Sequence, residues 1–281
     1  MKAHAILVLT AISAVFASAP VAAAQPPDAA RIEQIAGWLG DGTYSPTPRI
    51  DDRAFWTSVG QSGRFADVAR EAAAESKRSP AALPDDLYLE YSRNGNRSRY
   101  EAVYFRKLKA YRVLVIAECV ENKGRFLEPI QRVITSYAAD KTWVLPAHDS
   151  GLENFEGRNI TIDLFSSEVA CDLATTDHLL GQQLSESTRA LLRKEVRRRV
   201  FDPYEHAVKD GRSRIGWITT TNNWNAVCLA NVTGAALALL DRREERAFYV
   251  ASAEKYIASF LSGFTADGYC SEGVGYWNYG F

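Results

Sequence analysis

The stretch Trp224–Leu240, WNAVCLANVTGAALALL, is apolar or small at most of its positions. A helix of that composition has no broad polar face to turn toward water, so we expect it to be buried on all sides. The next segment, Glu244–Phe264, is amphipathic, because its apolar residues recur at helical spacing along one face. Those apolar residues are Val250, Ala253, Ile257, Phe260 and Phe264. The two segments predict a helical hairpin with a buried inner helix and an outer helix exposed along one side.

The same pairing of an apolar and a more polar segment occurs twice upstream. Val103–Val120 is followed by Phe126–Ala139, and Leu164–Leu180 is followed by Ser187–Phe201. The starts of the three apolar helices recur at about sixty residues, which is typical of stacked helical hairpins. We therefore predict an all-α protein, an incomplete (α/α) toroid of helical hairpins. It is expected to be incomplete because fewer hairpins can be placed than a closed toroid needs.

The N-terminal part is expected to hold a signal peptide over residues 1–24. Lys2 gives a positive start, Ile6–Val15 an apolar run, and Ala22–Ala24 a cleavage site of small residues. The run is short for a membrane anchor, so we expect a soluble chain in the bacterial periplasm or secreted, without membrane association after cleavage. Residues 25–281 are then one helical domain, in which residues 25–85 form a helical entry region. Strand-like segments are few and isolated, Asp86–Tyr91 being one.

Two polar motifs near the C-terminus carry the candidate chemistry. Asn222–Cys228 reads NNWNAVC, and Asp267–Gly280 reads DGYCSEGVGYWNYG. Both are dense in Asn, Tyr, Trp and Glu, the side chains that stack on sugar rings and bond sugar hydroxyls. Each motif lies where a buried helix is expected to begin. The polar groups should therefore gather at one mouth of the helical fold.

These motifs resemble those of the heparinase II/III-like polysaccharide lyases and the related alginate and oligoalginate lyases. Trp143–Asp149 (WVLPAHD) and Ile162–Leu164 (IDL) fit the same pattern, and the resemblance covers roughly residues 85 to 281. It implies an α/α toroid that is followed, in the family, by β-sheet domains absent from this chain. Trp224 also stands where several members have His. We therefore expect a truncated N-terminal portion of a lyase, weak or inactive on its own.

The resemblance implies cleavage of uronic-acid-containing glycans by β-elimination. In that reaction a base removes the C5 proton, an acid protonates the leaving oxygen, and a neutral donor binds the carboxylate. By resemblance Asn223 is the donor to the carboxylate, with Asn222 as the alternative, and Tyr276 or Tyr279 is the acid and possibly the base. The expected substrate contacts are Asn222, Trp224, Asn225, His148, Glu272 and Trp277.

Each of these residues also has a structural interpretation. Asn222 and Asn223 are suited to capping a helix, and Tyr276 and Tyr279 are suited to packing between helices. Glu272 fits an anchor for the glycine-rich turn. Trp224 and Trp277 suit a sugar-stacking platform, although core packing is the better account for at least one of them.

Two other functions remain open. An α/α-toroid glycoside hydrolase would use two carboxylates as acid and base, for which Asp163, Asp267 and Glu272 are available. A non-catalytic carbohydrate-binding remnant is the third possibility. In each case the expected partner is an acidic polysaccharide or oligosaccharide, and the sequence does not decide which glycan or which oligomeric state.

Composition limits the other partners. The formal net charge is −1, from 33 basic and 34 acidic residues, so no overall field favours nucleic acid or anionic lipid. Cys119, Cys171, Cys228 and Cys270 follow no metal-binding pattern. An oxidising compartment permits disulfides, but burial as small hydrophobic residues is at least as good an account. We expect no metal site and no cofactor.

Overall fold

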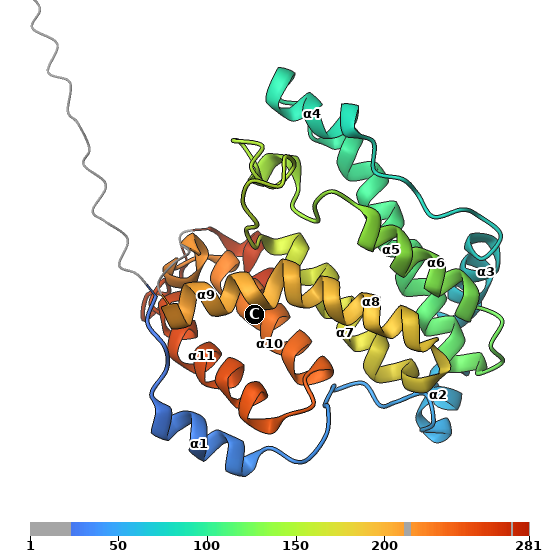
Figure 1. The fold of residues 1–281 in the computed structure, drawn as a ribbon, viewed down its shortest axis with the longest axis horizontal. Helices are drawn as coiled ribbons and strands as arrows, with labels where there is room; N and C mark the ends of the chain where they lie inside the picture. Colours follow the sequence, from blue (N-terminus) through green and yellow to red (C-terminus); the bar gives the residue numbers. More distant parts are fainter. Residues whose placement is uncertain (1–23, 211–214, 271, 281) are drawn as a thin grey trace, which may run out of the picture.

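The computed structural model describes residues 24–210, 215–270 and 272–280, and their regular structure is helical (Figure 1). The described residues contain no strand, only an isolated antiparallel bridge between Phe264 and Cys270. The prediction of an all-α fold is therefore confirmed. The α-helices are α1 Ala29–Trp38, α2 Arg53–Gly60, α3 Phe65–Glu75, α4 Asp85–Asn94, α5 Ser98–Glu121, α6 Leu127–Ala139, α7 Leu164–Leu180, α8 Glu186–Val196, α9 Asp202–Asp210, α10 Asn223–Leu239, α11 Arg243–Leu261 and α12 Trp277–Gly280.

Short helical turns connect these elements. They are η1 Pro146–His148, η2 Gly181–Gln183, the π-helical turn η3 Arg197–Phe201, η4 Gly216–Thr219 and η5 Val274–Tyr276. Because α8, η3 and α9 follow without a break, the outer helix expected at Ser187–Phe201 runs on to Asp210.

The main body consists of the three expected hairpins, α5 with α6, α7 with α8, and α10 with α11. The inner helix α7 packs against both α5 and α10, and the outer helices α6 and α8 pack against each other. α2 and α3 lie against α5, and α1 lies against α11 (Figure 1). This order suits an arc of a toroid, and the incomplete toroid itself stays a prediction.

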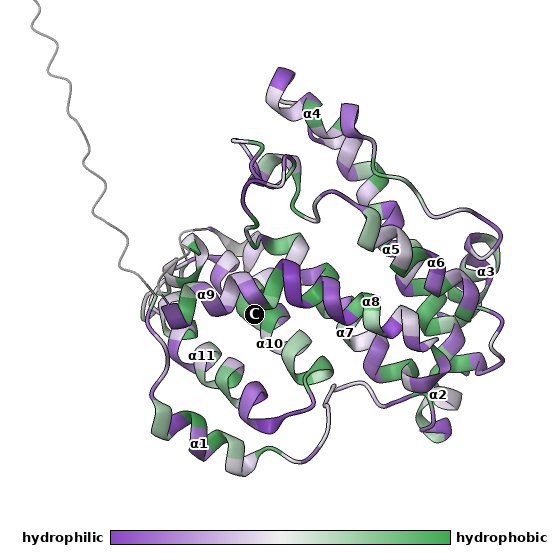
Figure 2. Ribbon diagram, viewed as in Figure 1, coloured by the Kyte–Doolittle hydropathy of each residue, from purple (hydrophilic) through white to green (hydrophobic). Residues whose placement is uncertain are grey.

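The inner helices supply most of the core. Ala170, Leu173 and Ala174 of α7 are almost fully buried, as are Leu229 and Val232 of α10. The outer helix α8 carries many hydrophilic residues (purple in Figure 2). Burial on all sides of the inner helices and on one side of the outer ones follows from this two-layer arrangement.

Two inner helices begin at the same end of the molecule, and each start is set by a side-chain cap. Asp163 caps α7, because its carboxylate accepts from the Ser166 backbone N–H at 2.7 Å while the Ser166 hydroxyl lies 2.9 Å from the Asp163 N–H. Asn222 caps α10 by accepting from the Trp224 N–H at 3.2 Å. These caps fix the sequence position at which each helix starts.

The expectation of a strand-like segment at Asp86–Tyr91 is wrong, because these residues lie within α4. Tyr88 is buried, and its hydroxyl donates to Asp149 at 2.9 Å, so one helical face is anchored to the loop after η1. Asp85 and Asp86 in the first turn complement the helix dipole. Gly95 ends the helix in the left-handed conformation that favours glycine.

The entry region is helical as expected, through α1, α2 and α3. The predicted signal peptide lies, apart from Ala24, outside the described residues. In the part of the chain that the structure covers, no helix combines the length and apolar character needed to cross a bilayer. All four cysteines are described, and none of them forms a disulfide.

Candidate functional site

The candidate site lies where η1 meets the N-terminal ends of α7 and α10. His148 ends η1, and its Nδ1 lies 2.7 Å from Oδ2 of Asp163. The same carboxylate oxygen accepts from the Leu145 backbone N–H at 3.2 Å. Asp163 therefore fixes the start of α7, the chain before η1 and the imidazole of His148 together. This contact orients the ring and leaves Nε2 as the nitrogen without a hydrogen bond to the described residues.

A pocket of about 230 Å³ opens beside this histidine–aspartate pair. Trp217, Trp224 and Ile215 form much of its apolar wall, while His148 and Thr161 supply polar groups. Trp217 is held in place because its indole N–H donates to the Ile162 carbonyl at 2.8 Å. An apolar pocket with a few fixed polar groups is typical of a small-molecule subsite.

Aromatic rings form a continuous row through the site. The His148 ring lies edge-on to Trp224, with centroids 4.6 Å apart, and stacks at 6.0 Å on Phe165. Phe165 in turn contacts Phe105 of α5 at 5.2 Å. Phe105 is 38% exposed and the other three are partly exposed, so the row is accessible along its length. Such a row can stack on successive sugar rings.

The two asparagines at the start of α10 have different surroundings. The Oδ1 atom of Asn222 accepts from the Trp224 N–H and from the Thr220 hydroxyl at 2.9 Å, and its Nδ2 has no partner among the described residues. Asn223 is only 4% exposed, and its Nδ2 donates to Oε1 of Glu272 at 2.5 Å. Asn222, which is partly exposed, therefore presents a free amide donor, whereas the donor of Asn223 is used inside the protein.

Glu272 links the C-terminal segment to α10. Besides the Asn223 side chain, it accepts from the Asn223 backbone N–H at 2.7 Å. This agrees with the expected role of Glu272 as an anchor for its turn. The Oδ1 atom of Asn223 is buried without a hydrogen-bond partner among the described residues, which is a costly arrangement in a folded protein.

The two candidate tyrosines lie in the segment that Glu272 anchors. Tyr276 is 51% exposed and Tyr279 44% exposed. Partial burial raises the pKa of the Tyr279 phenol, and the negative charges of Glu168 and Asp163 raise it further. α12 packs closely on α10, where a Cβ at Gly280 would lie 3.7 Å from the Asn223 Cα. It would also approach the ring of Phe260, on the neighbouring α11, to 2.7 Å, so that ring would have to shift to admit a side chain.

Two residues that were expected to contact substrate, Asn225 and Trp277, are not seen to line the pocket. Asn225 is fully buried, and its amide donates to the η4 carbonyls of Ile218 at 2.7 Å and Trp217 at 3.3 Å. It thus fastens η4 to α10 instead of facing solvent. Trp277 belongs to α12, but its side chain lies outside what the structure describes.

The three carboxylates considered for hydrolysis do not form a free acid–base pair. Asp163 is 2% exposed, and both of its oxygens accept hydrogen bonds. Glu272 is occupied by Asn223, and Asp267 lies in an exposed turn, where it accepts from the Thr265 hydroxyl. No group of three or more His, Cys, Asp or Glu side chains in the described part could hold a metal ion.

Comparison with known proteins does not assign the chain to a family. No protein-family model matches the chain, and no curated protein matches it either.

Three contributors to the site are not recognised in these roles from the sequence. The sequence offers Asp163 as part of the IDL motif and as a hydrolytic carboxylate; an Asp directly before a helix with Ser three positions later also indicates a helix cap. Phe105 and Phe165 were counted as parts of apolar helices. Nothing local in the sequence distinguishes them from core residues, because their exposure depends on how α5 and α7 pack.

Proposed function

We propose that this protein is a polysaccharide lyase that cleaves a uronic-acid-containing glycan by β-elimination in the pocket beside His148. The observation that carries the proposal is the 2.7 Å contact between His148 and Asp163, placed beside the accessible ring of Trp224. A base with a fixed orientation next to a sugar-stacking surface is what proton abstraction from a bound sugar requires. The motif resemblance to the heparinase II/III-like lyases supports the same reaction.

In the proposed reaction Nε2 of His148 removes the proton at C5 of the uronate. The electron pair left at C5 forms the C4–C5 double bond, and the C4–O bond to the leaving sugar breaks. Tyr279 gives its phenolic proton to the departing oxygen, a role supported by its raised pKa, which keeps the phenol protonated near neutrality. Solvent then returns a proton to Tyr279 and takes one from His148.

The donor to the uronate carboxylate is assigned to Asn222. Its Nδ2 is free and its Oδ1 is fixed by two hydrogen bonds, so the amide is oriented before substrate arrives. A neutral donor at that position stabilises the charge that develops on the carboxylate when the C5 proton leaves. Asn223 would act indirectly, by holding Glu272 and with it the segment that carries Tyr279.

We also propose that the chain is exported, to the periplasm or beyond the cell. The supporting observations are the N-terminal pattern of Lys2 and Ile6–Val15 and a contact at the expected cleavage position. There, the Gln25 N–H donates to the Tyr256 hydroxyl at 2.7 Å, and Lys255 donates to the Gln25 carbonyl at 3.2 Å. If cleavage leaves Gln25 as the N-terminal residue, these contacts hold it against α11.

The test is an assay for unsaturated uronide, which absorbs in the ultraviolet, with heparan sulfate and alginate as substrates. We expect slow product formation by the purified chain, reduced at least about 100-fold by His148→Gln and by Tyr279→Phe, because acid–base groups contribute factors of that size. Matched controls are His206→Gln, on an exposed position of α9, and Tyr269→Phe, at a 60% exposed position; both should retain the wild-type rate. Product formation unaffected by His148→Gln and Tyr279→Phe would contradict the assignment.

A non-catalytic glycan-binding role is the second candidate, and the aromatic row from Phe105 to Trp224 favours it. Tryptophan fluorescence during glycan titration separates the two functions. Binding without any product over long incubation would support the binding module and reject the lyase. Product formation would reject the purely binding role.

A further inference from the structure

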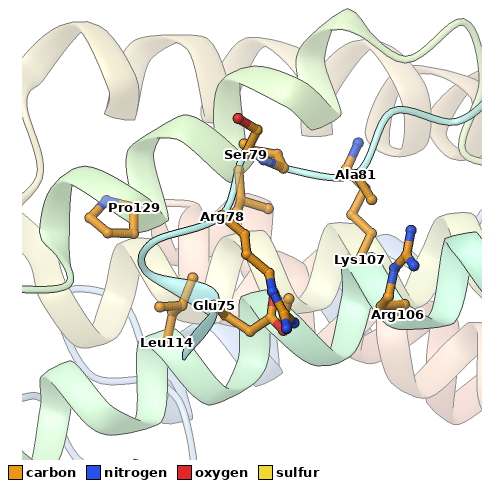
Figure 3. Close-up of a pocket in the computed structure, with 11 residues that line it drawn as sticks. Glu75, Arg78, Ser79, Ala81, Arg106, Lys107, Leu114 and Pro129 are labelled. Carbon is orange, nitrogen blue, oxygen red and sulfur yellow. The ribbon is translucent and has the colours of Figure 1, made fainter. Parts of the chain in front are cut away.

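A second pocket, of about 370 Å³, lies among α3, α5, α6 and the connection that follows α3 (Figure 3). Its α5 residues are Arg106, Lys107, Ala110 and Leu114. With 3.6 residues per turn, these positions share one face of α5, and Phe105, the α5 member of the aromatic row, falls on the opposite face. The pocket is therefore separate from the candidate site beside His148.

The charges around this pocket leave one positive charge unbalanced. Arg78 lies 2.5 Å from Glu75, and Lys107 lies 2.7 Å from Asp140, so each of these pairs is neutral overall. Arg106 forms no ion pair with the described residues. Because the pairs cancel, the pocket carries the net charge of a single guanidinium.

Lys107 adds unused hydrogen-bond donors to that charge. It is only 2% exposed, and its ammonium group makes one hydrogen bond, to Oδ2 of Asp140. An ammonium carries three N–H groups. The ammonium also lies 4.5 Å from the centre of the Tyr137 ring, and Asp140 is its one hydrogen-bond acceptor among the described residues. Figure 3 shows Arg106 and Lys107 rising next to each other from α5 toward the connection at Ala81.

The rest of the lining is apolar. It comes from the α5 and α6 side chains together with two residues of the connection, namely Pro80, Ala81, Ala110, Leu114, Pro129 and Val133. A volume near the lower end of the range for ligand pockets suits a small molecule. An inorganic ion would leave these apolar surfaces uncovered.

We propose that this pocket binds a small organic monocarboxylate, whose carboxylate contacts Arg106 and Lys107 and whose apolar body lies against Ala110, Leu114 and Val133. One negative charge matches the one unbalanced positive charge. A guanidinium binds a carboxylate with two parallel hydrogen bonds, and an adjacent ammonium adds a third. The apolar body displaces water from the α5–α6 surface.

The experiment uses benzoate as the probe and isothermal titration calorimetry of the full chain as the measurement. Benzoate should bind saturably, benzamide should bind at least about tenfold more weakly because it lacks the charge, and inorganic phosphate should also bind more weakly because it has no apolar body. Equal affinity for benzoate and benzamide, tighter binding of phosphate, or no saturable benzoate binding would each overturn the proposal.

Variants locate the site. Arg106→Gln should weaken benzoate binding about tenfold, and Ala110→Leu should abolish it by filling the apolar part of the pocket. Arg99→Gln is the matched control, since Arg99 is an exposed arginine of the same helix that pairs with Glu90 outside the pocket. Arg106 is exposed, so its replacement leaves the fold intact, which circular dichroism verifies. Unchanged affinity in Arg106→Gln, or an equal loss in Arg99→Gln, would reject this location.

Discussion

The imidazole of His148 and the carboxylate of Asp163 are joined by a 2.7 Å contact between Nδ1 and Oδ2, although fifteen positions separate them in the chain. Asp163 is at the same time the N-cap of α7. One buried carboxylate therefore sets both where an inner helix begins and how a candidate base is oriented. Site geometry and fold stability are coupled at this residue, and variants of Asp163 should separate the two contributions.

Asp163→Ala should lower the free energy of unfolding by about 1–3 kcal/mol, because it removes the cap and leaves the Leu145 and Ser166 N–H groups without their acceptor. Asp163→Asn should lower it by about 1–2 kcal/mol, because the amide oxygen can keep the cap to Ser166 while the NH2 group cannot accept from the Leu145 N–H and His148. Its lyase rate should nevertheless fall at least about tenfold, because the charge that stabilises a protonated His148 is lost. Urea unfolding and the ultraviolet assay measure the two effects.

The matched control is Asp28→Ala. Asp28 also caps a helix, accepting from the Ala30 N–H at 3.0 Å, but it is exposed and lies at the start of α1. Its loss should cost about 0.5–1 kcal/mol and leave the lyase rate unchanged. If Asp163→Ala were no more destabilising than Asp28→Ala, the linking role of Asp163 would be refuted.

Trp224→Ala should weaken glycan binding about three- to tenfold, the factor expected when a sugar loses one aromatic stacking surface. Trp224 contacts the His148 ring and lines the pocket, so its loss removes the stacking surface closest to the proposed base. Trp38→Ala is the control, because Trp38 is 64% exposed on α1 and outside the row. Affinity chromatography on immobilised glycan measures both variants, and an equal retardation of the two would argue against the row as a binding surface.

The helices were predictable because their apolar periodicity is a local property. The expected helix Leu164–Leu180 has the boundaries of α7, since Asp163 precedes it as the N-cap and Gly181 follows it. Asp86–Tyr91 was the exception. There the alternation of Leu87, Leu89 and Tyr91 imitates the pattern of a strand. The segment is helical, and its Tyr88 is buried with its hydroxyl bonded to the distant Asp149.

The site was less predictable than the helices. The sequence indicated that Asn222, Asn223 and Glu272 belong to one region, and the structure brings Asn223 and Glu272 into contact. It gave no sign that Asn223 would use its amide internally while Asn222 keeps a free donor. That difference depends on which side of the α10 N-terminus faces the segment after Cys270, a tertiary property.

Thiol chemistry gives a further prediction. Because Cys119, Cys171, Cys228 and Cys270 are unpaired, a reducing agent should not change the unfolding temperature, even for protein purified from the periplasm. Burial raises the pKa of the Cys119 thiol to about 12 and that of Cys171 to about 11, which suppresses the reactive thiolate. Thiol titration should detect four groups in denaturant and almost none in the native protein. Fewer than four after unfolding would reveal a disulfide and contradict the structure.

The buried pair of Lys107 and Asp140 gives the last prediction. Their side chains are 1% and 8% exposed, and burial lowers the pKa of Lys107 and raises that of Asp140. Lys107→Met leaves the carboxylate buried without its cation and should cost about 3–5 kcal/mol at neutral pH. The double variant Lys107→Met, Asp140→Leu should recover most of that loss, because an apolar pair of similar volume needs no desolvation of charge.

The loss in Lys107→Met should depend on pH in a defined direction. Without the cation, the folded-state pKa of Asp140 rises further above its unfolded value, so the folded protein holds a proton that the unfolded chain has released. The stability of the variant should therefore fall as pH rises through that raised pKa and recover on acidification. Urea unfolding at acidic and neutral pH, compared with the exposed Lys109→Met control, measures the effect. A pH-independent loss, or a double variant no more stable than Lys107→Met, would show that side-chain packing, and not an unpaired buried charge, sets the cost.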